Sequence, residues 1–91
     1  MQTVIKGEKR YIGMKVTRRR DIPFTISNAA YDVNGIQSGS CEIDQGSKEI
    51  YFLLDTTKTQ FIKNRSYIAQ FTVTVQGLEK IIKGEVTINI R

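Results

Sequence analysis

The segment from Tyr67 to Val75 constrains the fold of this chain more than any other part of the sequence. Apolar residues occupy every second position in it, namely Tyr67, Ala69, Phe71, Val73 and Val75. Side chains alternate between the two faces of a β-strand, so the segment predicts a strand with one apolar face and one largely polar face. Such a strand needs other strands beside it and a second layer against its apolar face.

Short strand patterns recur along the rest of the chain, separated by polar turns. The further predicted strands cover 3–5, 12–16, 24–33 (with a kink near 28–30), 36–43, 50–54 and 82–90. Asn34 and Gly35 predict a tight hairpin turn, because both residues accept positive φ. The 50–54 strand is apolar on both faces, which predicts a central strand covered on both sides. The sequence therefore predicts one all-β sandwich domain, residues 1–91, of about seven antiparallel strands.

The residue types that are missing from the sequence narrow its chemistry. The 91 residues include no histidine and no tryptophan, and Cys41 is the only cysteine. Without histidine, imidazole-based catalysis and nearly all zinc sites are excluded. A single cysteine excludes an intrachain disulfide and indicates a reducing cytoplasm. The sequence also has no glycine-rich phosphate-binding motif. We therefore expect no enzymatic activity, no cofactor and no bound metal.

Cys41 and a group of three carboxylates are the other candidates for chemical sites. Cys41 has no histidine to activate it as a nucleophile, so we interpret it as a small buried residue. Glu42, Asp44 and Asp55 are not spaced as the ligands of a calcium-binding loop. The two aspartates stand at predicted strand ends, where aspartate commonly closes turns. Neither set predicts a functional site.

The clearest candidate for a binding site is a cluster of cations near the amino terminus. The chain carries a net charge of +5, with basic residues concentrated in residues 1–20 and an acidic excess in residues 21–60. The candidate partner-binding residues are Arg18, Arg19, Arg20, Lys15 and Arg10. They could neutralise phosphates, dock on an acidic protein surface, or form a solvated hairpin tip. Because no aromatic residues alternate with them to stack on bases, we favour the protein contact or the solvated tip over nucleic acid.

Local patterns in the sequence carry a resemblance to known proteins. In immunoglobulin-like domains a tyrosine near the start of the penultimate strand precedes a cysteine by two residues, and its hydroxyl ties down a corner. Tyr67 occupies this place, whereas Ala69 stands where the cysteine would be. Further matching segments are 23–26, 29–31, 38–44 and 52–57. On these residues the chain resembles small, disulfide-free immunoglobulin-like structural proteins of tailed bacteriophages and prophages, and is similar to the N-terminal domains of upper baseplate proteins.

The resemblance implies a non-enzymatic virion structural or assembly protein of the head, neck, tail or baseplate, with no catalytic residues to carry over. Its partners would be other virion proteins or further copies of the chain, in the virion or in the host cytoplasm during assembly. The alternatives are a bacterial immunoglobulin-like adaptor or adhesion module and a small basic nucleic-acid-binding domain. Open sheet edges could pair with a neighbouring subunit. No apolar run is long enough to span a membrane, so we expect no membrane partner.

Overall fold

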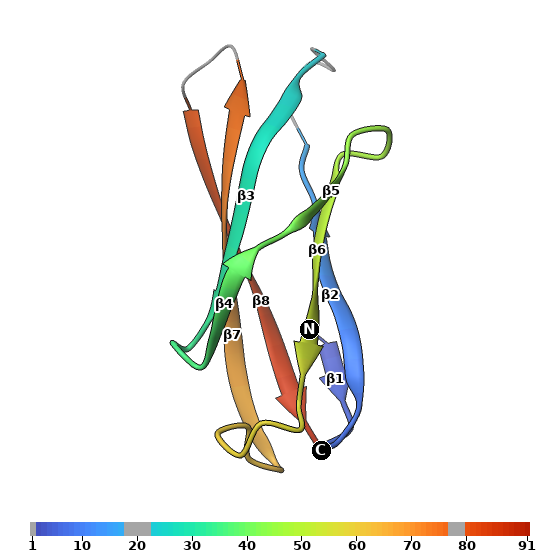
Figure 1. The fold of residues 1–91 in the computed structure, drawn as a ribbon, viewed down its shortest axis with the longest axis vertical. Coiled ribbons are helices and arrows are strands. Elements are labelled where there is room, and N and C mark those ends of the chain that lie inside the picture. Colours follow the sequence, from blue (N-terminus) through green and yellow to red (C-terminus); the bar gives the residue numbers. More distant parts are fainter. Residues whose placement is uncertain (1, 18–22, 77–79) are drawn as a thin grey trace.

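The computed structural model describes residues 2–17, 23–76 and 80–91, and these residues form eight strands and no helix. The strands are β1 (Gln2–Val4), β2 (Lys9–Lys15), β3 (Thr25–Val33), β4 (Gln37–Ser40), β5 (Glu42–Asp44), β6 (Glu49–Asp55), β7 (Arg65–Gln76) and β8 (Lys80–Ile90). They build a five-stranded sheet in the order β1-β8-β7-β3-β4 and a three-stranded sheet in the order β2-β6-β5. The two sheets form the two layers of an elongated molecule (Figure 1). The predicted all-β class is confirmed.

β7 is the middle strand of the larger sheet, and it has strands on both sides, in agreement with the prediction that it needs other strands beside it. It pairs with β3 along one edge and with β8 along the other, antiparallel in both cases. All five of its predicted inward-facing residues are buried: Tyr67, Ala69, Phe71, Val73 and Val75. The apolar face of this strand therefore supplies a large part of the core.

Aromatic rings join the two sheets near the middle of the sandwich. Phe52 on β6 stacks on Tyr31 of β3, with ring centroids 3.7 Å apart and planes 6° from parallel. The same ring lies 5.7 Å from the ring of Phe71 on β7. Aromatic contacts of this kind add to the stabilisation that burial alone provides. Phe52 of the smaller sheet thus contacts two strands of the larger one.

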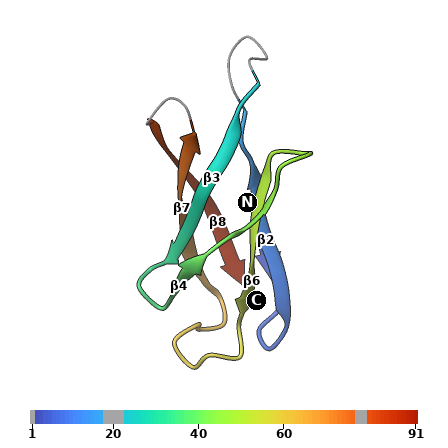
Figure 2. The ribbon, with the colours of Figure 1, turned by 45° about the horizontal axis from the view of Figure 1, so that its top comes forward.

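The chain changes sheets where the sequence predicted one continuous strand over 36–43. β4 belongs to the larger sheet and β5 to the smaller one, and the chain crosses between them at Cys41. Figure 2 shows this crossing as one green segment that runs diagonally from β4 toward β5. The apolar and polar alternation continues through the crossing, so the pattern could not reveal it. The prediction of about seven strands was low by one for this reason.

The amino-terminal strand also differs from the expectation of an all-antiparallel sandwich. β1 pairs in parallel with the end of β8, with Gln2 opposite Ile88 and Val4 opposite Ile90. The backbone N–H of Arg91 then donates to the carbonyl of Val4 at 2.9 Å. The first strand therefore pairs within its own chain, along the last three residues of β8. A short apolar segment carries no information about strand direction, so the sequence could not predict this pairing.

β6 is the central strand of the smaller sheet, as predicted, but it is covered on one side only. Ile50, Phe52 and Leu54 point into the core and are buried. On the outer face Leu53 is 42% exposed and Tyr51 is half-buried. The prediction that this strand is covered on both faces was wrong within the single chain.

Local irregularities of β3 agree with the sequence patterns. Asn34 and Gly35 adopt φ values of 50° and 73°, as a tight turn of this type requires. The register of β3 against β7 shifts between Ile26 and Asn28, next to the predicted kink. A bulge at this place returns the later residues of β3 to the inward face.

Two glutamine side chains link the sheets along the side where β4 passes into β5. The amide of Gln37 donates to the carbonyl of Leu53 at 2.9 Å and accepts from the N–H of Asp55 at 3.1 Å. The amide of Gln45 donates to the carbonyl of Ile26 at 2.6 Å and accepts from its N–H at 3.1 Å. Each side-chain amide therefore bonds one backbone N–H and one backbone C=O at a sheet edge, as a neighbouring strand would. Without the amide these backbone groups would be left unpaired.

The hydroxyl of Tyr67 fastens the connection between β6 and β7. It accepts a hydrogen bond from the N–H of Ile62 at 2.8 Å and donates one to the carbonyl of Gln60 at 3.1 Å. The Tyr67 ring packs edge-on against the buried ring of Phe61, with centroids 5.2 Å apart. One side chain thereby holds the whole connection against the core.

Replacing Tyr67 with phenylalanine should lower the free energy of unfolding by about 1–3 kcal/mol, because two backbone groups lose their partner while the ring remains. Urea denaturation checks this. Tyr11→Phe is the matched control, because the Tyr11 side chain is 61% exposed. The free energy of unfolding of this variant should stay within about 0.5 kcal/mol of the wild-type value. If both substitutions changed the free energy of unfolding equally, the hydrogen bonds of the Tyr67 hydroxyl would not stabilise the fold.

Candidate protein-binding face

The structure separates the described members of the predicted cation cluster. Arg18, Arg19 and Arg20 lie outside the described residues. Arg10 and Lys15 lie near opposite ends of β2 and, five residues apart, point to opposite faces of the strand. The Arg10 guanidinium donates to the carbonyl of Thr3 at 2.9 Å and lies 3.8 Å from the Glu8 carboxylate. Arg10 and Lys15 therefore do not form a common site.

The outer face of the three-stranded sheet carries a group of exposed apolar side chains that the sequence analysis did not single out. We call Tyr11, Tyr51 and Leu53 the tyrosine face. Tyr11 is 61% exposed and Leu53 is 42% exposed, and these two residues are cross-strand partners on β2 and β6. The rings of Tyr11 and Tyr51 meet edge to face, with centroids 5.6 Å apart. Tyrosine is among the residues enriched in protein interfaces.

A glycine beside these rings leaves a hollow in the face. Gly13 is paired with Tyr51, and a Cβ atom at Gly13 would lie only 2.6 Å from the carbonyl oxygen of Ile50. Relieving this contact would require the backbone of β6 to move, so the position excludes every residue with a Cβ atom. The resulting hollow of about 390 Å³ includes Tyr11, Tyr51 and Lys15 in its lining. The flank of the Tyr51 ring is therefore accessible from outside.

Oppositely charged pairs border the tyrosine face at both ends. Lys9 is opposite Asp55 at one end, and Lys15 is opposite Glu49 at the other. Hydrogen bonds from Thr57 lower the pKa of Asp55, and the charge of Lys9 lowers it further. The face thus has an apolar centre between charged ends, the arrangement of a protein interface with a polar rim.

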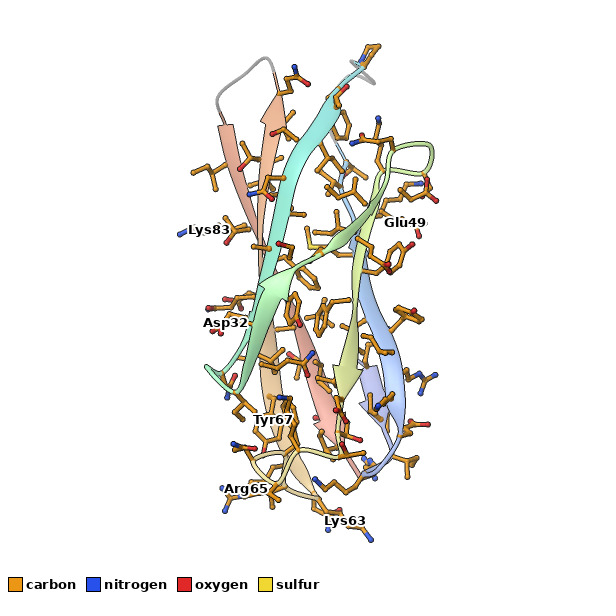
Figure 3. All side chains as sticks on the ribbon, viewed as in Figure 1. Asp32, Glu49, Lys63, Arg65, Tyr67 and Lys83 are labelled. Atoms are coloured by element: carbon orange, nitrogen blue, oxygen red, sulfur yellow. The ribbon has the colours of Figure 1, made fainter. Side chains whose placement is uncertain are left out.

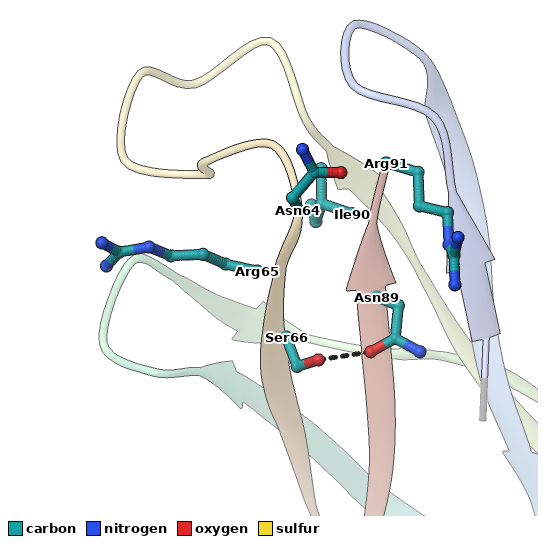
Figure 4. Close-up of a pocket in the computed structure, with 6 residues that line it drawn as sticks. All are labelled: Asn64, Arg65, Ser66, Asn89, Ile90 and Arg91. Carbon is teal, nitrogen blue, oxygen red and sulfur yellow. Dashed lines mark hydrogen bonds between the residues drawn. The ribbon is translucent and has the colours of Figure 1, made fainter.

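The strand ends near the carboxyl terminus form a second, more polar hollow of about 280 Å³ (Figure 4). Ser66 and Asn89 are hydrogen-bonded side by side at its base. Arg65 and Arg91 also line it, but Figure 4 shows their side chains extending to opposite sides of the strand pair. Because the two guanidinium groups do not converge, the hollow does not have the geometry of an anion site.

The aspartates considered as metal ligands close turns instead. Asp44 accepts hydrogen bonds from the N–H groups of Gly46 at 3.0 Å and Ser47 at 3.3 Å, and hydrogen bonding to Ser47 lowers its pKa. Within residues 2–17, 23–76 and 80–91, no three His, Cys, Asp or Glu side chains lie close enough to hold a metal ion. The same part of the chain has no helix of the length and hydropathy that a membrane span requires.

Cys41 is half-buried against the core, and burial raises the pKa of its thiol from 9.0 to about 11. The thiolate is the reactive form, so at pH 8 a disulfide reagent should label the folded protein roughly 100-fold more slowly than the urea-unfolded chain. The protonated thiol contributes stability that is fully present below pH 9 and is lost as the pH rises through about 11. Equal labelling rates would contradict the half-buried position of Cys41.

No protein-family model, no curated protein and no solved structure matches this chain.

Proposed function

We propose that this sandwich is immunoglobulin-like. The strand order supports this, because β8-β7-β3 with β4 at its edge corresponds to the GFC sheet with an added C′ strand, and β2-β6-β5 corresponds to the BED part of the other sheet. The hydroxyl of Tyr67 bonds to backbone a few residues upstream, as the conserved tyrosine of such domains does. Ala69 is buried in the core at the place of the second cysteine.

We further propose that the protein is a phage or prophage virion structural or assembly protein that acts through protein–protein contacts. The observation that carries this proposal is the tyrosine face, an exposed apolar centre with a hollow beside it and charged ends. A single-stranded nucleic acid would need an excess of cations around the rings. Here Lys9 and Lys15 each lie opposite a carboxylate, and β5 adds Glu42 to the same sheet, so the face favours a protein partner.

The test is incorporation into particles produced by the strain that carries the gene. Wild-type chain should co-sediment with purified particles and be detected in them by mass spectrometry. The double variant Tyr11→Ser, Leu53→Ser removes two apolar side chains from the face, and its incorporation should fall about tenfold or more.

Ile68→Ser is the matched control, because Ile68 is also 42% exposed but lies on β7 of the other sheet. Its incorporation should equal that of wild type, and all variants should unfold with free energies within about 1 kcal/mol of one another. Wild-type chain that is absent from particles would exclude a structural role in the virion. If only Ile68→Ser abolished incorporation, the interface would lie on the larger sheet and not on the tyrosine face.

A further inference from the structure

β8 has a long open edge. Its last three residues, Ile88–Ile90, pair with β1, and its other side pairs with β7 along Lys80–Ile90. Over the seven residues 81–87, no strand of the described residues pairs with the second edge of β8. Unpaired backbone N–H and C=O groups on such an edge are a template for another strand.

The sequence of this open edge is complementary to itself when reversed. An antiparallel pair of two copies centred on Gly84 would place Lys83 opposite the Glu85 position of the second copy, and Glu85 opposite its Lys83 position. In the same register Ile82 lies opposite Val86, and Ile81 lies opposite Thr87. Opposite charges and apolar pairs directly across an antiparallel ladder are both stabilising.

Neighbouring symmetric registers lack this complementarity. Shifting the centre to residue 83 places the two copies of Lys83 opposite each other, and shifting it to residue 85 does the same for Glu85. Like charges directly opposite are destabilising. In the matching register the ladder extends from Ile81 to Thr87. It ends there because Lys80 of one copy would lie opposite Ile88 of the other, which is already paired with β1.

The side chains of β8 are oriented to suit this pairing. Lys83 and Glu85 are exposed on the outer face, and Ile82 and Val86 are half-buried on the inner face. The Glu85 carboxylate accepts a 3.4 Å hydrogen bond from the Gln70 amide, and neither Glu85 nor Lys83 has an ion pair with another described residue. Figure 3 shows Lys83 on the opposite side of the molecule from Glu49, which borders the tyrosine face.

We propose that this protein forms a symmetric dimer in which the β8 strands of two copies pair antiparallel about Gly84, joining two five-stranded sheets into one. The inner-face residues Ile82 and Val86 would continue the apolar layer from one copy to the other. Because the tyrosine face lies elsewhere, the dimer leaves it accessible, and this proposal does not rest on that face. A seven-residue edge is a small interface, so the dimer depends on protein concentration.

The test is analytical ultracentrifugation of the wild-type chain and of charge variants between about 10 µM and about 1 mM, the range in which small interfaces associate. Wild type should pass from monomer to dimer as the concentration rises. Lys83→Glu and Glu85→Lys each create two like-charge pairs in the dimer, so each should weaken it about tenfold or more.

The decisive experiment is ultracentrifugation of a mixture of the two single variants. A Lys83→Glu chain paired with a Glu85→Lys chain has opposite charges at both positions, so the mixture should form a heterodimer more stable than either homodimer. The double variant Lys83→Glu, Glu85→Lys should restore self-association. Lys63→Glu, the same charge change in the turn before β7, should leave the dimer unchanged.

The proposal would be overturned by a wild-type chain that stays monomeric at about 1 mM, by single variants that dimerise as well as wild type, or by a mixture that forms no preferred heterodimer. Dimerisation lost with Tyr11→Ser and kept with the β8 variants would also overturn it, because it would place self-association on the tyrosine face. Failure of the β8 dimer leaves the particle-incorporation test unaffected, so the two proposals fail separately.

Discussion

Replacing Phe52 with alanine should cost about 3–5 kcal/mol of the free energy of unfolding, the range for a buried phenylalanine. Phe52 is 3% exposed and contacts Tyr31 and Phe71, which belong to two strands of the opposite sheet. Its loss leaves a cavity where the sheets meet, and a domain of this size has only about 5–15 kcal/mol in total. Thermal denaturation should show a midpoint lower by about 12 °C or more.

Leu53→Ala is the control for this prediction, because Leu53 is the next residue of the same strand and points outward at 42% exposure. Leu53→Ala should lower the free energy of unfolding by only about 0.5 kcal/mol, well below the loss expected for Phe52→Ala. If the two substitutions destabilised the protein equally in urea, Leu53 would have to be buried in solution. That outcome would point to a permanent partner on the tyrosine face.

The second large effect is expected at Thr56, the only buried polar residue of the described chain. Its hydroxyl accepts a hydrogen bond from the N–H of Gly7 at 2.9 Å and donates to the carbonyl of Glu8. Gly7 has a φ of 98°, in the turn that carries the chain from β1 in one sheet to β2 in the other. Thr56→Val keeps the shape and removes the hydroxyl, so it should cost about 1–3 kcal/mol.

Hydrogen exchange separates this effect from general loss of packing. In Thr56→Val the amide of Gly7 should lose protection, because its acceptor has gone. Thr56→Ser keeps the hydroxyl and should keep that protection, at the cost of one buried methyl group, about 0.8 kcal/mol. A valine variant with wild-type stability and a protected Gly7 amide would show that the Thr56 hydroxyl does not fix this turn.

Local features of the fold were predictable because they depend on residues close together in the sequence. The alternation in Tyr67–Val75 gave the inward-facing residues of β7 correctly, although the strand extends further, from Arg65 to Gln76. Asn34 and Gly35 have the positive φ values that their residue types favour. The apolar pattern of residues 50–54 correctly predicted a central strand. In each case the side-chain period or the backbone preference of single residues was sufficient.

The candidate site was only partly predictable. The cation cluster was inferred from nearness in the sequence, yet Arg10 and Lys15 point to opposite faces of β2 because strand side chains alternate. The tyrosine face combines Tyr11 with Tyr51 and Leu53, which are some forty residues away in the sequence and meet through strand pairing. The second apolar face of residues 50–54 was the signal that could have indicated it.

By itself the sequence determined that this chain forms a two-layered β structure without a disulfide, with Tyr67–Val75 as a core strand. The tertiary structure decided that Cys41 marks a change of sheet, that β1 runs parallel to β8, and that β8 keeps an open edge over residues 81–87. The reason is physical. Alternation specifies which face of a strand is apolar, but the partner, the direction and the unpaired edge of a strand depend on contacts between distant segments.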